Sequence, residues 1–122
     1  MSVIHSGMIM HEMSIAVNIV AIAEDTARRA GAKKINAISL DLGALSGVVK
    51  DALEFCFESA CKNTMAEGAA LELRVIPARA VCESCGHRFE AEQMAPLCPN
   101  CGELVFQLNG GTELKVKSIN VD

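Results

Sequence analysis

The sequence predicts an α+β protein, with two helices on one face of a small three-stranded sheet and a lobe inserted before the last strand. Three observations favour this fold class. Two segments repeat apolar residues at helical spacing, three segments alternate apolar and polar residues, and four of the six cysteines cluster late in the chain. We therefore expect an α/β body of residues 10–78 and 112–122, a Cys-rich lobe of residues 79–111, and an N-terminal extension of residues 1–9.

The first predicted element is a helix over residues 14–30. Apolar side chains recur there at steps of three and four residues, and charged side chains supply the opposite face. The apolar set is Ile15, Ile19, Ile22 and Ala23. Ser14 is a candidate cap for the start of this helix, and Gly31 can end it.

Three strands and a second helix complete the body. The strands are predicted at residues 35–42, 70–76 and 113–121, where apolar residues alternate with polar ones. Residues 43–47 form a turn, and the second helix follows over residues 49–63. Its apolar stripe consists of Val49, Leu53, Cys56, Phe57 and Ala60. We interpret Cys56 as a small buried hydrophobe, while Cys61 lies off the stripe and receives no role.

Composition and charge exclude several classes of function. The net charge is −4 and the chain has no Trp or Tyr, so neither a phosphate-binding nor a base-stacking surface is expected. No apolar run approaches the roughly 20 residues of a membrane helix, and residues 1–14 carry no Lys or Arg, unlike a signal peptide. We expect a cytoplasmic protein without nucleic-acid or membrane partners. It is not expected to be an enzyme, because no phosphate-binding loop or catalytic set is apparent.

The cysteines of the lobe form two C-x-x-C pairs separated by twelve residues. The pairs are Cys82 with Cys85 and Cys98 with Cys101. Zinc prefers four tetrahedral ligands, and each C-x-x-C turn places two thiolates on one ion. The glycine after each pair, Gly86 or Gly102, permits the tight backbone of such turns. Because so short a segment has few apolar side chains, we expect a zinc-ribbon-like lobe held by a structural zinc ion.

Other uses of these cysteines are less favoured. Two local disulfides suit a secreted protein, and a redox-active pair at Cys98 and Cys101 would need to begin a helix after a strand. A rubredoxin-like iron site fits the spacing, but the lobe lacks the aromatic packing expected around it. His87 is either an exposed loop residue, a supporting group or an alternate ligand. The lobe carries two basic and four acidic residues, which disfavours binding to nucleic acid.

Several short segments give the chain a family resemblance. In order they are Met-His-Glu-Met-Ser at 10–14, Leu-Gly-Ala-Leu-Ser at 42–46, Ala-Glu-Gly-Ala-Ala-Leu at 66–71, the two C-x-x-C pairs, and Gly-Thr-Glu-Leu at 111–114. Together they resemble the HypA/HybF family of hydrogenase nickel-incorporation proteins. The resemblance extends from Met10 to about Val121, and the Met-His-Glu segment combined with the paired cysteines is its most specific part.

The resemblance implies a metallochaperone with a nickel-binding body and a zinc lobe. By position, it makes His11 the main nickel ligand, with Glu12 beside it, and the four cysteines of the C-x-x-C pairs the zinc ligands. Such proteins work with a nickel-handling GTPase to deliver Ni(II) to [NiFe]-hydrogenase large-subunit precursors, and in some organisms also serve urease. The resemblance leaves a homodimer open. Imidazole and other nitrogen or oxygen ligands suit Ni(II), whereas a closed thiolate cage would retain its ion.

The chain departs from the family pattern at its start. Residues 1–9 precede the Met-His-Glu segment, which in the family begins the protein. We expect Met10 to be the native start, so that its amine can join His11 in binding nickel. With the extension present the amine is not free, and His5 then becomes an additional candidate ligand. Two alternatives remain: a zinc-ribbon regulatory or protein-interaction module without nickel function, and a rubredoxin-like electron carrier.

Overall fold

The computed structural model describes residues 9–122, with side chains from residue 12 onward. The helices are α1 (Ile9–Arg29) and α2 (Lys50–Cys61), and the strands are β1 (Ile35–Gly43), β2 (Ala70–Ile76), β3 (Ala78–Val81), β4 (Arg88–Ala91), β5 (Leu108–Asn109) and β6 (Leu114–Val121). His5 and the rest of residues 1–8 lie outside the described residues, so the proposal of His5 as a ligand stays a prediction.

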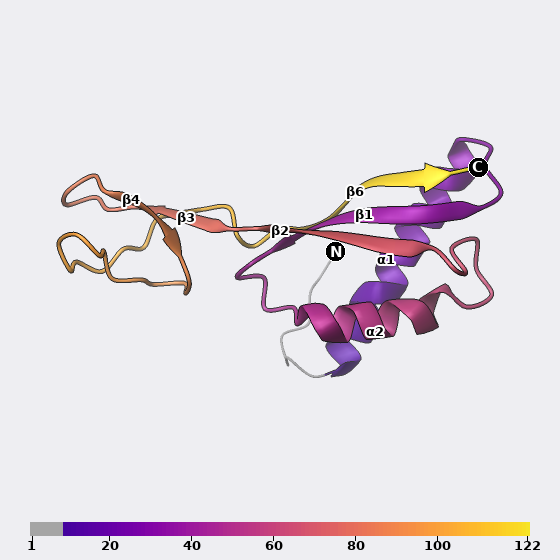
Figure 1. Ribbon diagram of the computed structural model, residues 1–122, viewed down its shortest axis with the longest axis horizontal. Helices are drawn as coiled ribbons and strands as arrows, with labels where there is room; N and C mark the ends of the chain where they lie inside the picture. The colour runs from indigo at the N-terminus through magenta and orange to yellow at the C-terminus, as the bar shows by residue number, and fades with distance from the viewer. Residues whose placement is uncertain (1–8) are drawn as a thin grey trace. The chain divides into compact units, whose positions relative to one another are not determined.

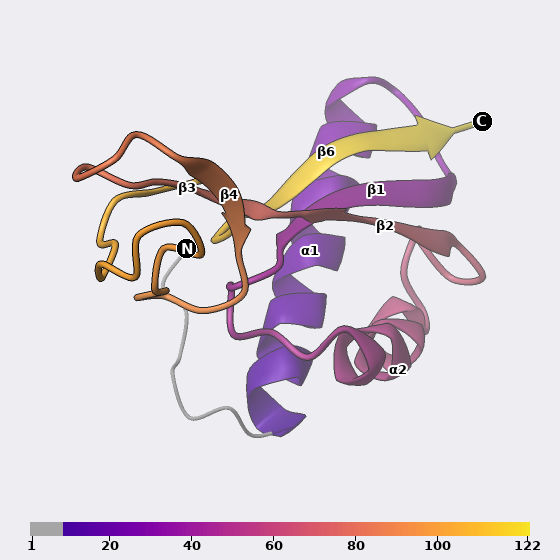
Figure 2. The same ribbon diagram turned by 60° about the vertical axis from the view of Figure 1, so that its left-hand side comes forward.

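The predicted three-stranded sheet is confirmed. Its strand order is β2-β1-β6, so the central strand comes first in sequence and the last strand of the chain pairs beside it. Figures 1 and 2 show α1 crossing behind these strands and α2 lying near the β2 edge. Apolar side chains of the helices and of β1 form the core; among them Ile15, Ile19, Ile38, Leu40, Leu53 and Phe57 are buried. The α+β fold class follows from this packing.

The two helices differ from the prediction at their ends. Helix α1 begins at Ile9 and not at Ser14, so the Met-His-Glu segment lies inside its first turn. The prediction that the helix begins only after this segment is therefore wrong, and Glu12 is buried. Ile22 is exposed, contrary to its predicted place on the apolar stripe of α1.

The predicted stripe of α2 also needs correction at its two ends. Val49 is exposed and stands at the N-cap, one position before the helix begins. At the other end Cys61 is buried, although its spacing had placed it off the stripe, because it faces the core from the last turn. Cys56 is buried as expected.

A second, smaller sheet occupies the Cys-rich part of the chain. Its strand order is β4-β3-β5, and antiparallel pairing places Ala80 opposite Phe89 on one side and opposite Leu108 on the other. These strands are too short to be read from sequence alternation. Their small core is formed by Ala78, Ala80, Cys82, Ala91, Cys98 and Val105.

The chain forms two compact units. The first comprises the described residues up to Asp41 together with 47–74 and 115–122, and the second comprises residues 42–46 and 75–114. The predicted turn after β1 belongs to the second unit, where Leu45 packs against the small core. The backbone explains this assignment, because Leu45 N–H donates to the Gly111 carbonyl at 2.6 Å and Ala44 N–H donates to the Ile76 carbonyl at 2.8 Å.

The described part of the chain contains no helix that is both long enough and apolar enough to span a lipid bilayer.

Candidate metal centre

The two C-x-x-C turns have the same backbone geometry. In the first, Cys82 N–H donates to the His87 carbonyl at 2.9 Å and Gly86 N–H donates back to the Cys82 carbonyl at 2.7 Å. In the second, Cys98 N–H donates to the Glu103 carbonyl and Gly102 N–H to the Cys98 carbonyl, both at 2.8 Å. The glycine of each turn has a left-handed backbone, with φ of 77° at Gly86 and 81° at Gly102, so the sequence-based reason for these glycines is confirmed.

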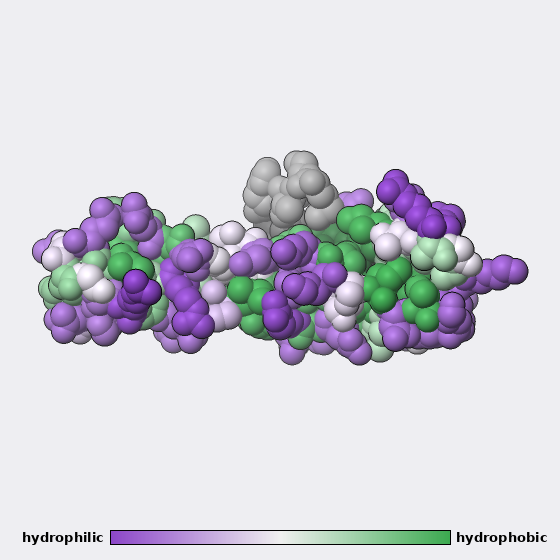
Figure 3. Space-filling model, turned by 90° about the horizontal axis from the view of Figure 1, so that it is seen from above, coloured by the Kyte–Doolittle hydropathy of each residue, from purple (hydrophilic) through white to green (hydrophobic). Residues whose placement is uncertain are grey.

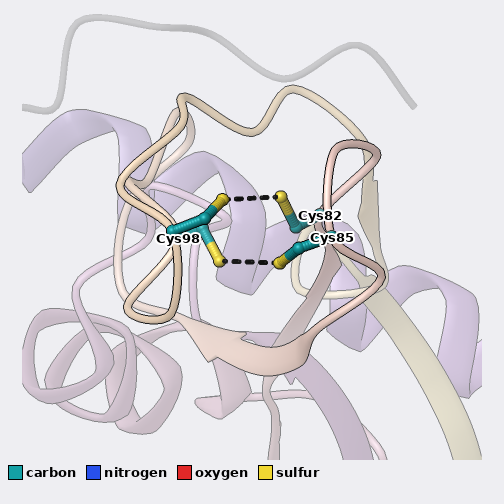
Figure 4. Close-up of side chains that lie close together, drawn as sticks. Cys82, Cys85 and Cys98 are labelled. Carbon is teal, nitrogen blue, oxygen red and sulfur yellow. Dashed lines mark hydrogen bonds between the residues drawn. The ribbon is translucent and has the colours of Figure 1, made fainter.

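The turns bring all four cysteine sulfurs together. The Sγ atoms of Cys82 and Cys101 lie 3.5 Å apart and those of Cys85 and Cys98 lie 3.7 Å apart, and all four ligand atoms lie within 4.8 Å of one another. Figure 4 shows Cys82 and Cys85 on one loop with Cys98 facing them from the other. Four thiolates around a tetrahedral zinc ion at 2.3 Å would stand about 3.8 Å apart. The cage therefore has the size that such an ion needs.

Hydrogen bonds to sulfur connect the two turns. Asn100 donates from its backbone N–H to Cys98 Sγ at 3.4 Å and from its side-chain amide to Cys85 Sγ at 3.5 Å. The Asn100 amide, with the backbone N–H of His87, lowers the pKa of Cys85 to about 6. Both donors stabilise a thiolate, which is the form that binds a metal ion. The role of Asn100 was not foreseen, because the residue between two cysteines carries no signal of its own.

The His87 side chain is not one of the ligands of this cage. Among the described residues, the one group of side chains close enough together to hold a metal ion consists of the four cysteines. The His87 ring stacks instead on Phe89, with ring centroids 5.9 Å apart and an angle of 14° between the planes. Of the interpretations left open for His87, the exposed loop residue agrees best with this placement.

The Met-His-Glu segment lies in the first unit, in the first turn of α1. Glu12 is only 1% exposed, and its Oε2 accepts a hydrogen bond at 3.2 Å from the N–H of Val49, the N-cap residue of α2. A carboxylate at this position stabilises the positive end of α2 and ties the start of one helix to the start of the other. Sequence alone does not reveal this contact, since Glu12 and Val49 are far apart in the chain.

Comparison with known families matches nearly the whole chain. The family model described as "Hydrogenase/urease nickel incorporation, metallochaperone, hypA" matches residues 10–121. The hydrogenase maturation factor HypA of Geobacter metallireducens is 42% identical over 113 residues, which cover 93% of this chain and all of that protein. Hydrogenase maturation factor HypA 2 of Bradyrhizobium diazoefficiens is 41% identical with the same coverage.

Two solved structures have the same fold. One is the solution structure of a HypA protein, with a TM-score of 0.65 and 23% sequence identity over 92% of this chain and 96% of that one. The other is the solution structure of the nickel metallochaperone HypA from Helicobacter pylori, with a TM-score of 0.63 and 21% identity over 90% and 96%. At these identities the likeness concerns the fold.

Proposed function

Because the chain belongs to the HypA family of hydrogenase and urease nickel-incorporation metallochaperones, we propose that it carries Ni(II) to [NiFe]-hydrogenase large-subunit precursors during their maturation. The observation that carries this proposal is the family match over residues 10–121, which includes the Met-His-Glu segment and both C-x-x-C pairs. In this function nickel is cargo and not a resident cofactor. Urease is the second client to test, since the family description includes it.

Zinc is the ion that suits the four-cysteine cage. Sulfur separations of 3.5 and 3.7 Å match a tetrahedral thiolate site, and Cys82 and Cys98 are buried in the small core of the second unit. A bound ion would close the second unit, whose apolar core is made largely of alanine and cysteine side chains. The division into a nickel-binding body and a zinc-binding lobe is part of this proposal.

The nickel residues in this proposal are His11 and Glu12. His11 lies in the first turn of α1, where the backbone N–H groups have no acceptor within the helix, so a backbone nitrogen that releases its proton to solvent can bind a metal ion without breaking an intrahelical bond. The Glu12 carboxylate supplies negative charge one residue away, which offsets the repulsion between a cation and the positive helix end. Imidazole and backbone nitrogen are ligands that suit Ni(II).

The proposed protein partners are those expected of a member of this family. A factor that delivers nickel during maturation must meet the hydrogenase precursor that receives the ion, and we include a nickel-handling GTPase as the partner that drives the transfer. A homodimer remains part of the proposal and is checked by sedimentation.

Hydrogenase activity in a host strain that lacks its own maturation factor tests this function. Wild-type protein should restore activity at low nickel, and His11→Ala should not, although both variants hold one zinc. If the chain is instead a zinc-ribbon regulatory module, it will bind zinc but not nickel, and it will not restore hydrogenase activity. A red, iron-containing protein would point to the electron-carrier alternative.

A further inference from the structure

Three large apolar side chains near the second C-x-x-C pair are exposed. Leu97 and Leu104 are partners across an antiparallel bridge, and Phe106 lies two residues after Leu104, with the buried Val105 between them. We call Leu97, Leu104 and Phe106 the apolar ridge. Their exposed fractions are 63%, 47% and 71%.

Backbone hydrogen bonds on both sides of the Leu97–Leu104 pair explain why these two side chains point away from the small core. Val105 N–H donates to the Pro96 carbonyl at 2.9 Å, and Cys98 N–H donates to the Glu103 carbonyl at 2.8 Å, so the Leu97–Leu104 pair lies between two hydrogen-bonded pairs. Side chains of such an intervening pair stand close together. Because Val105 and Cys98 are buried in the small core, the alternation of the strands holds Leu97 and Leu104 outward.

The ridge adjoins a shallow acidic groove of about 250 Å³, whose lining includes Phe89, Glu90, Glu92, Pro96, Leu97 and Pro99. This volume is below the roughly 300–1,000 Å³ of typical small-molecule sites, so the groove suits side chains of a protein segment. In the view of Figure 3, apolar residues also reach the surface of the second unit among hydrophilic ones.

The segment that carries the ridge has a negative net charge. Residues 89–114 contain four glutamates and no lysine or arginine, and the proposed zinc–thiolate centre would add two further negative charges. Arg79 stands opposite Glu90 across the strand pair and offsets part of that charge, which leaves Glu92 as the principal carboxylate of the groove. A second copy would bring the same acidic segment against itself, so self-association through the ridge is disfavoured.

From these observations we infer that the apolar ridge docks a segment of another protein in which apolar side chains are flanked by Lys or Arg. The apolar residues of that segment would cover Leu97, Leu104 and Phe106, and its basic residues would lie over Glu92 and Glu90. This docking surface belongs to the second unit and acts without nickel, so it can be tested separately from nickel transport.

The test uses the full-length, zinc-loaded, nickel-free protein and a short synthetic peptide that alternates Leu and Lys. The peptide should shift the backbone amide resonances of residues 92–106. Phe106→Ser should raise its dissociation constant at least about tenfold, since central aromatic anchors dominate such interfaces. Phe55→Ser is the matched control, because Phe55 on α2 has the same exposed fraction of 71% and should leave the binding unchanged.

Two further peptides separate the contributions of charge and apolar contact. Replacing Lys by Glu, or Leu by Ser, should abolish binding. The inference is wrong if the Leu–Lys peptide does not bind, if the Leu–Glu peptide binds equally well, or if Phe106→Ser behaves like Phe55→Ser. A ridge-dependent dimer in sedimentation would also overturn it, by making a second copy the occupant. Zinc content is measured throughout, and Leu97→Ser carries the test if Phe106→Ser loses zinc.

Discussion

Glu12 is a buried carboxylate that connects two helices, and it lies in the segment proposed to bind nickel. Its Oε2 accepts the N–H of Val49 at the start of α2, and the side chain is almost fully buried. Removing the acceptor leaves a donor without that partner near the first turn of a helix. Glu12 therefore belongs to the packing of the first unit, whatever it contributes to nickel binding.

We predict that Glu12→Ala lowers the free energy of unfolding by about 1–3 kcal/mol even when no nickel is present. Urea unfolding of the nickel-free protein measures this effect. Glu12→Gln keeps an acceptor oxygen and should lose much less, which separates the hydrogen bond from the charge. Wild-type stability in Glu12→Ala would show that the contact to Val49 contributes nothing.

Cys61 gives a prediction about pH. Burial, with a smaller contribution from the Glu24 carboxylate, raises the pKa of Cys61 to about 11 from an ordinary value of 9.0. Well below pH 9 the thiol is neutral in both the folded and unfolded states, so it does not make stability depend on pH. Between pH 9 and about 11 the unfolded chain ionises first, and the free energy of unfolding should fall as the pH rises.

Urea unfolding of the zinc-loaded protein across this pH range measures the effect of Cys61. In Cys61→Ala the fall attributable to the thiol should disappear, although the variant will be less stable at all pH values because it leaves a small cavity. An unchanged slope in Cys61→Ala would contradict the assignment of this dependence to Cys61.

At the scale of elements, chain segments of the second unit cross so closely that two positions, Gly43 and Gly111, have no room for a side chain. Gly111 has φ of 94°, and a Cβ there would collide with the Cβ of Ala78 and lie 2.7 Å from its Cα. The same residue accepts the Leu45 N–H, and a Cβ on Gly43 would meet the Gly111 carbonyl group. The two glycines let three chain segments pass at backbone contact.

Gly111→Ala should therefore lower the free energy of unfolding by more than the cost of placing alanine in a left-handed backbone conformation. Gly68→Ala is a matched control, because Gly68 has φ of 80° but nothing within 4 Å of the added methyl group. The control should cost about 1–2 kcal/mol for the left-handed backbone, and Gly111→Ala a further 1–3 kcal/mol or so for the collision. Thermal unfolding of both variants checks this, and equal losses would show that the crossing relaxes freely.

The helices and strands also show what the sequence could and could not reveal. The apolar spacing of Ile15 and Ile19 was sufficient to place α1, and alternation placed β1, β2 and β6. The first turn of α1 was not predicted, because the polar residues His11 and Glu12 interrupt the apolar spacing. Glu12 is nevertheless buried, since a distant partner, the N–H of Val49, donates a hydrogen bond to it. Strands β3, β4 and β5 are stabilised by one another and span at most four residues, too few for a periodic signal.

For the whole molecule, the cysteine spacing predicted the cage well, since two C-x-x-C turns with glycine after them determine where four sulfurs can meet. It could not reveal Asn100 as a link between the turns, or that residues 42–46 join the second unit. Both depend on contacts between segments that are distant in sequence. The nickel residues rest on family membership and on the position of the Met-His-Glu segment in α1.

Nickel titration of the zinc-loaded protein by calorimetry, for wild type, His11→Ala and His87→Ala, tests the central claim most directly. His87 is the control because it lies exposed in the second unit, stacked on Phe89 and outside the four-cysteine cage. We predict that His11→Ala loses nickel binding while keeping its zinc and its helical signal, and that His87→Ala binds nickel as wild type does. Wild-type nickel affinity in His11→Ala would contradict the proposed nickel site.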